Sequence, residues 1–227
     1  MFDIVFISYN ETSADTNWTQ LKNKFNWAQR VHGVKGIHQA HIQAAKISKT
    51  PMIWIVDADA LITETFNFSF VPTRNNRDAV YVWRSINPIN DLEYGYGGIK
   101  LFPRNKTLDM DVTKPDMTTS ISDKFFPMKE ISNVTAFNTD PFSTWKSAFR
   151  ECAKLSSKVI DRQKNNETEE RLDIWCTVGK DRPFGEYAIQ GAVQGRQYGE
   201  KYAQSAIDMY KINDFDWLKK EFDNANS

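Results

Sequence analysis

The chain has 227 residues, 41% of them hydrophobic, and its formal net charge at pH 7 is zero. This length suits one globular domain, or two closely packed halves, with enough apolar residues for a core, and the neutral charge excludes the global basic field that drives non-specific nucleic-acid binding. The two cysteines exclude a disulfide framework.

The sequence contains no apolar run of about 18 or more residues, and its opening MFDIVFISYN has no basic n-region. It therefore predicts neither a membrane span nor a signal peptide, and we expect a soluble cytoplasmic protein with no membrane partner and no obligate protein partner. Between residues 16 and 49, six basic residues and all three histidines occur without an acid. This segment is either a basic face or the solvated surface of a helix.

The first predicted element is a buried parallel strand at Phe2–Ser8, FDIVFIS, which is almost continuously apolar. Tyr9, Asn10 and Glu11 follow it directly. Because ligands of open α/β sheets bind outside the carboxyl ends of the strands, Tyr9 could stack on a nucleotide base while Asn10 or Glu11 meets a ribose hydroxyl. Polar residues of an ordinary surface loop would give the same pattern.

A short helix capped by Asp15 and a second strand at 28–31 are expected next. After a glycine-containing turn at 32–36, apolar residues at helical spacing predict a helix at 37–49, which Pro51 stops.

Three polar side chains near this turn are candidates for binding. Lys35 lies in the glycine-flanked loop, from which a cation can reach a diphosphate. His38 and His41 share one face of the helix and could hold a metal, but histidines without a nearby carboxylate are more often structural.

The segment Ile53–Ile62, IWIVDADALI, is the most informative in the chain. Its apolar start is too short for an ordinary helix and rich in strand formers, so it predicts a buried strand that ends at Asp57, Ala58 and Asp59. A hard cation such as Mg²⁺ or Mn²⁺ commonly takes one or two carboxylates together with phosphate oxygens of the substrate. Asp-x-Asp also occurs by chance, in which case the pair merely ends a strand.

Residues 79–84 predict a further strand, and the stretch LEYGYGGIKLF at 92–102 predicts a glycine-rich turn that leads into another. Gly97 and Gly98 leave the backbone free to adopt positive φ and allow a ligand to approach closely. A bulge without a ligand would have the same composition.

The C-terminal half is expected to be more helical. Residues 114–138 are polar and turn-rich, with a strand at 133–137, after which Asp140 and Pro141 give a strong helix start signal. A second helix is expected at 167–175, and a short one after Asp214. Five glycines between residues 179 and 199 suggest a mobile segment before a helix at 203–210.

This order of segments resembles glycosyltransferases of the GT-A fold. The resemblance rests on an opening strand, an apolar strand ending in Asp-x-Asp, a strand carrying Gly-Gly with a basic residue beyond it, and an Asp just before a helix. It covers roughly the first two-thirds of the chain. The segments RVHGVKGI, YGYGGIKLF and FNTDPFSTWKSAFREC also look like small glycosyltransferase-like proteins of tailed phages.

The resemblance implies an α/β fold with a mostly parallel, Rossmann-like central sheet flanked by helices. It implies one domain over 1–227, with a nucleotide-sugar-binding half at 1–110 and an acceptor-side half at 111–227. Asp57 and Asp59 would hold Mn²⁺ or Mg²⁺ on the diphosphate. Asp140 would be the base of an inverting enzyme, although Thr139 replaces the usual acid before it.

The remaining implied site residues bind the nucleotide-sugar, namely Ser8, Tyr9, Asn10, Lys35, Ala58, Gly97 and Gly98, in addition to the two aspartates. No histidine lies beyond residue 41, so the third metal ligand is unassigned. The reaction implied is transfer of a hexose or pentose to an acceptor hydroxyl. In phages of this kind the acceptor could be a hydroxymethylated DNA base, in the cytoplasm of the host cell.

Two other classes stay open. A nucleotidyltransferase of sugar phosphates would also carry Asp-x-Asp at a strand end, but it usually has a glycine-rich basic loop after the first strand, and residues 9–15 contain neither glycine nor a basic residue. A non-catalytic sugar-binding virion protein that kept the fold is the third class.

Overall fold

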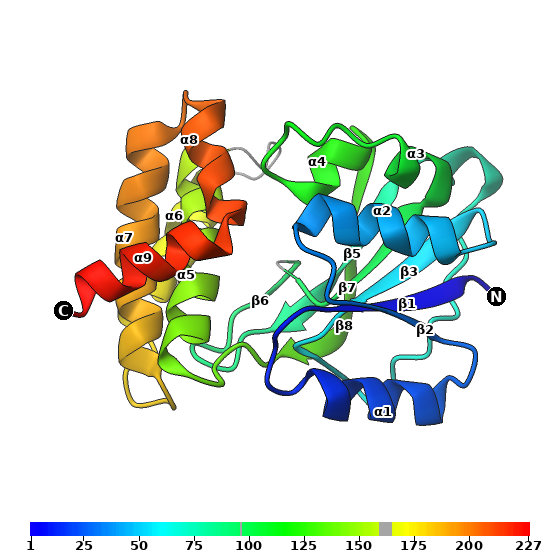
Figure 1. The fold of residues 1–227 in the computed structure, drawn as a ribbon, viewed down its shortest axis with the longest axis horizontal. Helices are drawn as coiled ribbons and strands as arrows, with labels where there is room; N and C mark the ends of the chain where they lie inside the picture. Colours follow the sequence, from blue (N-terminus) through cyan, green and yellow to red (C-terminus); the bar gives the residue numbers. More distant parts are fainter. Residues whose placement is uncertain (96, 159–164) are drawn as a thin grey trace. The chain divides into compact units, whose positions relative to one another are not determined.

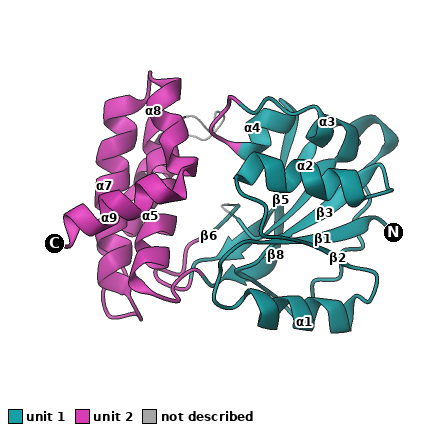
Figure 2. Cartoon of the chain, in the orientation of Figure 1, with its two compact units in different colours: residues 1–87, 93–112, 117–136 teal, residues 88–92, 113–116, 137–227 magenta. Residues whose placement is uncertain are grey.

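The computed structural model describes residues 1–95, 97–158 and 165–227. The chain divides into two compact units (Figure 2). Unit 1 comprises Met1–Asn87, Glu93–Val112 and Met117–Ala136, and unit 2 comprises Pro88–Leu92, Thr113–Asp116 and Phe137–Ser227. The division therefore differs from the expected boundary at residue 110, because most of 111–136 belongs to the first unit.

Unit 1 is an α/β structure built on one sheet, which contains eight strands within the described residues. The strands are β1 (Asp3–Ser8), β2 (Gln29–His32), β3 (Met52–Asp57), β4 (Ala60–Ile62), β5 (Val80–Ile86), β6 (Glu93–Tyr94), β7 (Ile99–Pro103) and β8 (Phe125–Thr135). Their order across the sheet is β2-β1-β3-β7-β5-β8-β4, and β6 pairs with β5.

The sheet is mixed, so the prediction of a mostly parallel sheet was wrong. β1 runs parallel to β2 and β3, and β5 runs parallel to β8, whereas β7 is antiparallel to both β3 and β5 and β4 is antiparallel to β8. A parallel return requires a long crossover, usually a helix, but the described part of the connection from β5 to β7 contains only the short strand β6. After this short connection, β7 runs antiparallel to β5.

Helices cover both faces of this sheet (Figure 1). α1 (Ala14–Lys24) lies on one face, while α2 (Ile37–Ile47), α3 (Arg104–Leu108) and α4 (Met117–Ile121) lie on the other, and a short 3₁₀ helix, η1 (Arg74–Asn76), precedes β5. The side chains of β3 alternate between two hydrophobic clusters, with Trp54 on the α1 face and Ile53 and Ile55 on the α2 face. A strand buried on both faces explains the continuous apolar run in the sequence.

The sequence predicted the longer elements of unit 1 but not the short elements β4, β6, η1, α3 and α4. Two predicted elements also differ in detail. The N-cap position of α1 is Ser13, and Asp15 lies inside the first turn, where its carboxylate pairs with Arg30 at 2.7 Å. β8 begins at Phe125, well before the expected strand at 133–137. Its first half is largely exposed and pairs with β5. Because these residues lack the alternation of apolar and polar side chains that predicts a strand, the sequence did not indicate this part of β8.

Unit 2 is mostly helical. Its described elements are α5 (Pro141–Ser157), α6 (Asn165–Thr177), α7 (Gly185–Tyr202), α8 (Ala206–Tyr210), the 3₁₀ helix η2 (Lys211–Asn213) and α9 (Phe215–Ala225). The backbone N–H of Ser143 donates to Oδ1 of Asp140 at 2.8 Å, which confirms the predicted cap of α5. Asp214 likewise caps α9 by accepting from two backbone N–H groups.

Four of the five glycines between residues 179 and 199 lie in the helix α7, and Gly179 lies before it, so the prediction that the helix begins only at residue 203 was wrong. Gly191, Gly195 and Gly199 recur every four residues along α7, and a Cβ on any of them would collide with the backbone of α5. The atoms in the way include the carbonyl oxygens of Trp145, Phe149 and Ala153, which also recur every four residues. The glycines therefore allow two helix backbones to pack closely.

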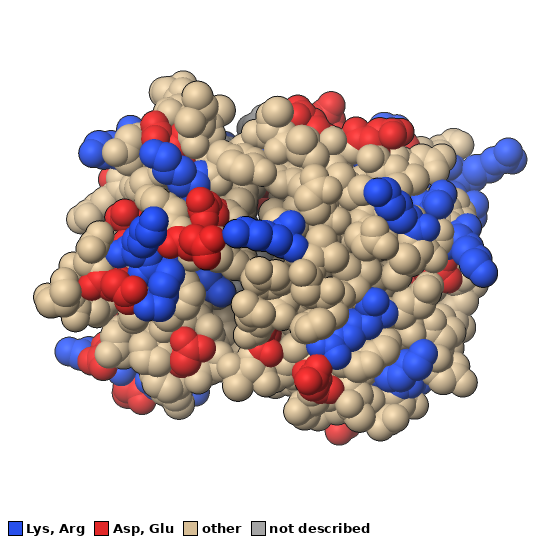
Figure 3. Space-filling view, viewed as in Figure 1, with Lys and Arg blue, Asp and Glu red and all other residues tan. Residues whose placement is uncertain are grey.

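Both units show basic and acidic side chains on the face drawn in Figure 3. Within the basic segment at 16–49, Lys22 donates to the carbonyl of Ala28 at 2.8 Å and Lys24 donates to that of Glu64 at 3.1 Å. None of the described helices is both long and apolar enough to cross a membrane.

Candidate metal and nucleotide site

Asp57 is the last residue of β3, and β7 holds it from one side. Its backbone N–H donates to the carbonyl of Gly98 at 2.9 Å, while the N–H of Gly98 lies 3.3 Å from Oδ2 of Asp57. The same Oδ2 accepts from the ammonium of Lys100 at 2.5 Å. The first carboxylate of Asp-x-Asp therefore already has a positive partner within unit 1.

These contacts determine the charge state of Asp57. Burial opposes ionisation of the carboxyl, but the charge and hydrogen bond of Lys100 outweigh it and hold the pKa of Asp57 below its usual value. Asp57 is therefore ionised at neutral pH. Lys100 was noted in the sequence only as a basic residue beyond the glycines, and its role could not be inferred before the β3–β7 register placed it beside the aspartate.

Asp59 lies in the tight turn between β3 and β4. The side-chain amide of Asn17 donates to the carbonyl of Ala58 at 2.8 Å, and the N–H of Ala136 donates to that of Asp59 at 2.7 Å. The turn is thus fixed from both sides, and Ala58 is buried beneath it. Within residues 1–95, 97–158 and 165–227, Asp59 forms no ion pair.

Asp59 has the opposite electrostatic environment from Asp57. Burial raises the pKa of Asp59, and the negative charges of Asp57 and Glu11 raise it further, to about 7. Two carboxylates that oppose each other's ionisation form a site whose repulsion a bound cation would relieve.

The residue types fit a hard divalent cation, which prefers oxygen ligands and completes its shell with water and phosphate oxygens. In the described part of the chain there is no group of three or more His, Cys, Asp and Glu residues placed to hold a metal. Asp57 and Asp59 are the two carboxylates that the sequence predicted as metal ligands, and no third ligand is assigned.

The carboxyl end of β1 lies next to this pair, because β1 and β3 are parallel neighbours with Ile7 opposite Asp57. Ser8 is buried here, and its hydroxyl lies 2.9 Å from Nδ1 of His32 and accepts from Nε of Arg30 at 2.9 Å. Sequence reasoning selected Ser8 but missed Arg30 and His32. Their place at the end of the adjacent strand β2 was the signal that could have indicated them.

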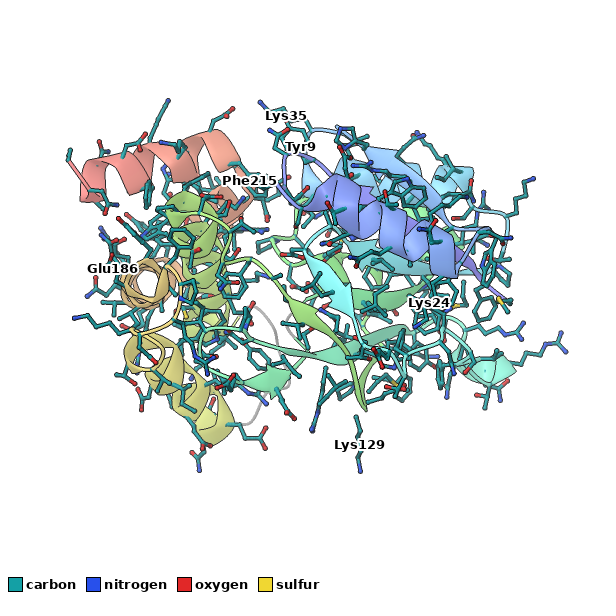
Figure 4. The ribbon with its side chains drawn as sticks, turned by 90° about the horizontal axis from the view of Figure 1, so that it is seen from below. Tyr9, Lys24, Lys35, Lys129, Glu186 and Phe215 are labelled. Carbon is teal, nitrogen blue, oxygen red and sulfur yellow. The ribbon has the colours of Figure 1, made fainter. Side chains whose placement is uncertain are left out.

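Tyr9, Asn10 and Glu11 follow Ser8 as expected. The N–H of Tyr9 donates to the carboxylate of Glu11 at 2.7 Å, so Glu11 folds back over the strand end, while Asn10 is exposed. Figure 4 shows Tyr9 and Lys35 at the same end of unit 1, in agreement with the backbone bond from Gly33 to Ser8. Tyr9 and Lys35 therefore lie at the same end of the sheet as Asp57, the last residue of β3.

The two glycines before β7 differ from each other. Gly98 has φ +82°, and a Cβ there would collide with the side chain of Asn133, whereas a Cβ on Gly97 would have its nearest neighbour, Thr135, 4.0 Å away. Asn133 belongs to a buried polar network in which Ser85 donates to the carbonyl of Gly97 at 2.8 Å. Gly98 is therefore required by local packing, and Gly97 is the glycine with free space beside it.

The two histidines of α2 are buried and have structural partners. Nδ1 of His41 lies 2.7 Å from the carbonyl of Ile37, and burial, together with the nearby charge of Lys100, lowers the pKa of His41 to about 4. Nε2 of His38 lies 3.3 Å from the hydroxyl of Ser120. Neutral His41 therefore adds no charge to the site.

Asp140 belongs to unit 2, where it caps α5. Its Oδ1 accepts from the N–H of Ser143, and its Oδ2 accepts from the hydroxyl of Thr139 at 3.2 Å. Partial burial opposes ionisation, but these hydrogen bonds prevail and lower the pKa of Asp140. The structure therefore accounts for Asp140 as a helix cap, and its role as a base stays a prediction.

No protein-family model matches the chain, and no curated protein matches it. Any functional assignment therefore depends on the chemistry of the site.

Proposed function

We propose that this chain is a metal-dependent glycosyltransferase, which moves a sugar from a nucleotide-sugar donor to an acceptor hydroxyl. The observation that carries the proposal is the carboxylate pair at the end of β3, in which Asp57 is ionised and Asp59 has a pKa of about 7 because of burial and neighbouring negative charge. Such a pair at the carboxyl edge of an α/β sheet suits a cation and a phosphate.

The finer fold assignment, GT-A-like, belongs to the same proposal. The three segments on which the resemblance rests in this half of the chain are neighbours in space, because β3 lies between β1 and β7. The Asp-x-Asp turn, the residues after β1 and the Gly-Gly segment therefore meet at one edge. This adjacency supports the assignment beyond the order of segments in the sequence.

In the proposed reaction, Asp57 and Asp59 would hold Mn²⁺ or Mg²⁺, and the cation would neutralise the charge that develops on the leaving nucleoside diphosphate. Lys100 and Lys35 provide further positive charge for the diphosphate. Tyr9 stacks on the base, and Asn10 meets the ribose. Gly97 leaves room for the sugar, and the acceptor to test first is a hydroxymethylated DNA base.

Two alternatives are distinguished by their products and metal dependence. A nucleotidyltransferase would release pyrophosphate from a nucleoside triphosphate and a sugar phosphate. A non-catalytic sugar-binding virion protein would bind a sugar without turnover. The absence of glycine and of basic residues from 9–15 favours the glycosyltransferase over the nucleotidyltransferase.

The proposal can be tested by calorimetry with uridine, guanosine and thymidine diphosphates, with and without Mn²⁺. We expect Mn²⁺-dependent binding of at least one of them to the wild type, and loss of that binding in Asp57→Asn and in Asp59→Asn. The matched control is Asp78→Asn, since Asp78 precedes β5 at the opposite edge of the sheet and pairs with Lys124 at 2.7 Å. Unchanged affinity and metal dependence in both site variants would overturn the assignment.

A turnover assay then separates the enzyme classes. The wild type is incubated with Mn²⁺, a panel of nucleotide sugars, and DNA that contains hydroxymethylated bases. Transfer of label to an acceptor supports the glycosyltransferase. Pyrophosphate release from a nucleoside triphosphate and a sugar phosphate would identify the nucleotidyltransferase instead.

A further inference from the structure

Unit 2 carries an open hollow of about 550 Å³ that none of the assignments above uses. Its walls come from α5, α7, η2 and α9, so it lies wholly within unit 2. The volume falls within the range of about 300–1,000 Å³ that is usual for small-ligand sites. Its walls combine aromatic rings with side-chain amides, chiefly Trp145, Tyr198, Trp217, Gln194, Gln197 and Asn224.

The aromatic part of the hollow has a buried base and a partly exposed wall. Trp145 and Phe149 are almost fully buried, while Tyr198 and Trp217 remain partly open to solvent. The rings of Tyr198 and Trp217 lie 5.3 Å apart, and the hydroxyl of Tyr198 donates to the carbonyl of Asp208 at 2.7 Å. Because that hydroxyl is already engaged, Tyr198 has its partly exposed ring left to contact a ligand, and Trp217 adds a second partly exposed ring.

Three amides supply the polar part. Oε1 of Gln194 accepts from the indole N–H of Trp145 at 2.7 Å, which fixes the side chain and leaves its NH₂ group to donate. Gln197 and Asn224 are exposed at the rim, and among the described residues their side-chain amides have no hydrogen-bond partner. An amide offers both a donor and an acceptor, as neighbouring hydroxyl groups require.

The charged side chains at the rim are of both signs. Lys211 pairs with Asp208 at 2.8 Å, Lys201 lies over the ring of Tyr202 at 4.9 Å, and Glu221 adds a negative charge. A site for a strongly anionic ligand would gather unpaired cations instead. This balance favours a neutral ligand.

We propose that this hollow binds a neutral saccharide. The C–H face of a pyranose ring packs on an aromatic ring, while its hydroxyls both donate and accept, and the partly exposed rings and amides of this hollow match those two requirements. A purely apolar ligand would leave the amides without partners. The inference does not depend on the proposed function of unit 1.

The test uses the full-length ¹⁵N-labelled protein, titrated with glucose, N-acetylglucosamine, maltose and cellobiose and followed by NMR. The side-chain NH₂ signals of Gln197 and Asn224 and the indole N–H of Trp217 report on the hollow directly. We expect at least one saccharide to shift these signals saturably. We also expect Trp217→Ala and Gln197→Ala to weaken binding by roughly 3- to 10-fold or more, as the loss of one such contact implies.

Three controls separate this site from other effects. Trp217→Tyr keeps an aromatic face and should retain most of the affinity, and Trp27→Phe, which changes a tryptophan 41% exposed in unit 1, should leave it unchanged. Gln197 is exposed, so its alanine variant is expected to fold even if Trp217→Ala does not. Mn²⁺-dependent nucleoside diphosphate binding should persist in Gln197→Ala, and saccharide binding should persist in Asp57→Asn.

The proposal is overturned if no saccharide of the panel shifts these signals, or if Gln197→Ala, and Trp217→Ala where it folds, bind the saccharide as tightly as the wild type does. Saturable shifts of the same signals by thymidine in place of any saccharide would also overturn it, because the ligand would then be a planar base.

Discussion

The ammonium of Lys100 lies 2.5 Å from Oδ2 of Asp57, across two neighbouring antiparallel strands in which Lys100 is paired with Ile55. This contact gives the two aspartates of Asp-x-Asp different properties. Asp57 has a compensating charge and a lowered pKa, whereas Asp59 has a raised one.

Removal of Lys100 should therefore destabilise the protein at neutral pH. We expect Lys100→Met to lower the free energy of unfolding by about 1–2 kcal/mol at pH 7. This value lies between those usual for exposed and for buried ion pairs, because 31% of the Asp57 side chain is exposed. Lys124→Met is the control, since it breaks a more exposed pair with Asp78 and should cost less than about 1 kcal/mol.

The loss of stability caused by Lys100→Met should depend on pH. The folded-state pKa of Asp57 is below the unfolded value of 3.8, so its stabilisation is present above that value and is lost as pH falls through the folded pKa. Urea unfolding at pH 7 and at pH 3 should thus show a smaller difference between variant and wild type at pH 3. Equal differences at both would contradict the role given to Lys100.

Asp59 should have the opposite pH dependence. Its folded-state pKa of about 7 lies above the unfolded value of 3.8, so the protonated form contributes stability that is fully present below about pH 4 and is lost as pH rises through 7. Asp59→Asn cannot ionise. Without divalent cations, we expect this variant to have a higher Tm than the wild type, with a larger difference at pH 8 than at pH 5, because only part of the contribution is lost at pH 5.

Thermal melts with Mn²⁺ complete this experiment. Metal ligands must be deprotonated, so Mn²⁺ should raise the Tm of the wild type more at pH 8 than at pH 5 and should not raise that of Asp59→Asn. If Asp59→Asn changes Tm by the same amount at both pH values, the result contradicts a raised pKa of Asp59.

Segments with strong local signals could be predicted from sequence. The apolar run of β3 and the Asp140-Pro141 start of α5 depend on residues close together in the chain, and both elements are present. β8 and α7 could not be predicted in this way. β8 depends on pairing with β5, and the glycines of α7 are required only because the backbone of α5 packs against them.

The site follows the same rule. Asp57 and Asp59 could be selected because they follow a buried strand. The contacts of Lys100 with Asp57, and of Arg30 and His32 with Ser8, join residues that are more than 20 positions apart, so they depend on the strand order. A single sequence gives the strands but not the register that brings these side chains together.

Gly97 and Gly98 form a matched pair. Gly98→Ala should lower stability by about 1–3 kcal/mol, because its φ of +82° strains an L residue and its Cβ would displace Asn133. Gly97→Ala should change stability by less than about 0.5 kcal/mol, since a Cβ there has space. Urea unfolding measures both, and equal losses would show that the space beside Gly97 is not available.

The same pair tests ligand approach. On the proposed function, Gly97→Val should weaken nucleotide-sugar binding more than it lowers Tm, because the larger side chain fills space that the sugar requires. Calorimetry and a thermal melt of this variant provide the two values. A collapse of Tm with unchanged binding would assign Gly97 to the backbone alone.

Gly195 should respond in the opposite way from an ordinary helical glycine. In a helix interior, Gly→Ala usually stabilises by about 0.5–1 kcal/mol. A Cβ on Gly195 would collide with the carbonyl oxygen of Phe149, so we expect Gly195→Ala to lower stability by about 1–3 kcal/mol. Val193→Ala, at a residue 37% exposed on the same helix, should change it by less than about 0.5 kcal/mol. A stabilised Gly195→Ala would contradict the close packing of α5 and α7.

Asp140 allows a helix cap to be distinguished from a catalytic base with one substitution. A cap requires only a side-chain acceptor, and Asn is nearly as good as Asp, so Asp140→Asn should change stability by less than about 1 kcal/mol. A base requires a group that can take a proton, and its loss should slow transfer by about 10²–10⁴-fold while donor binding is unchanged. Urea unfolding, calorimetry and single-turnover transfer measure the three quantities. If Asp140→Asn transfers at nearly the wild-type rate, Asp140 is only a cap. Either a retaining mechanism or another carboxylate, with the buried Asp116 and Glu151 tested next, must then take the place of the base.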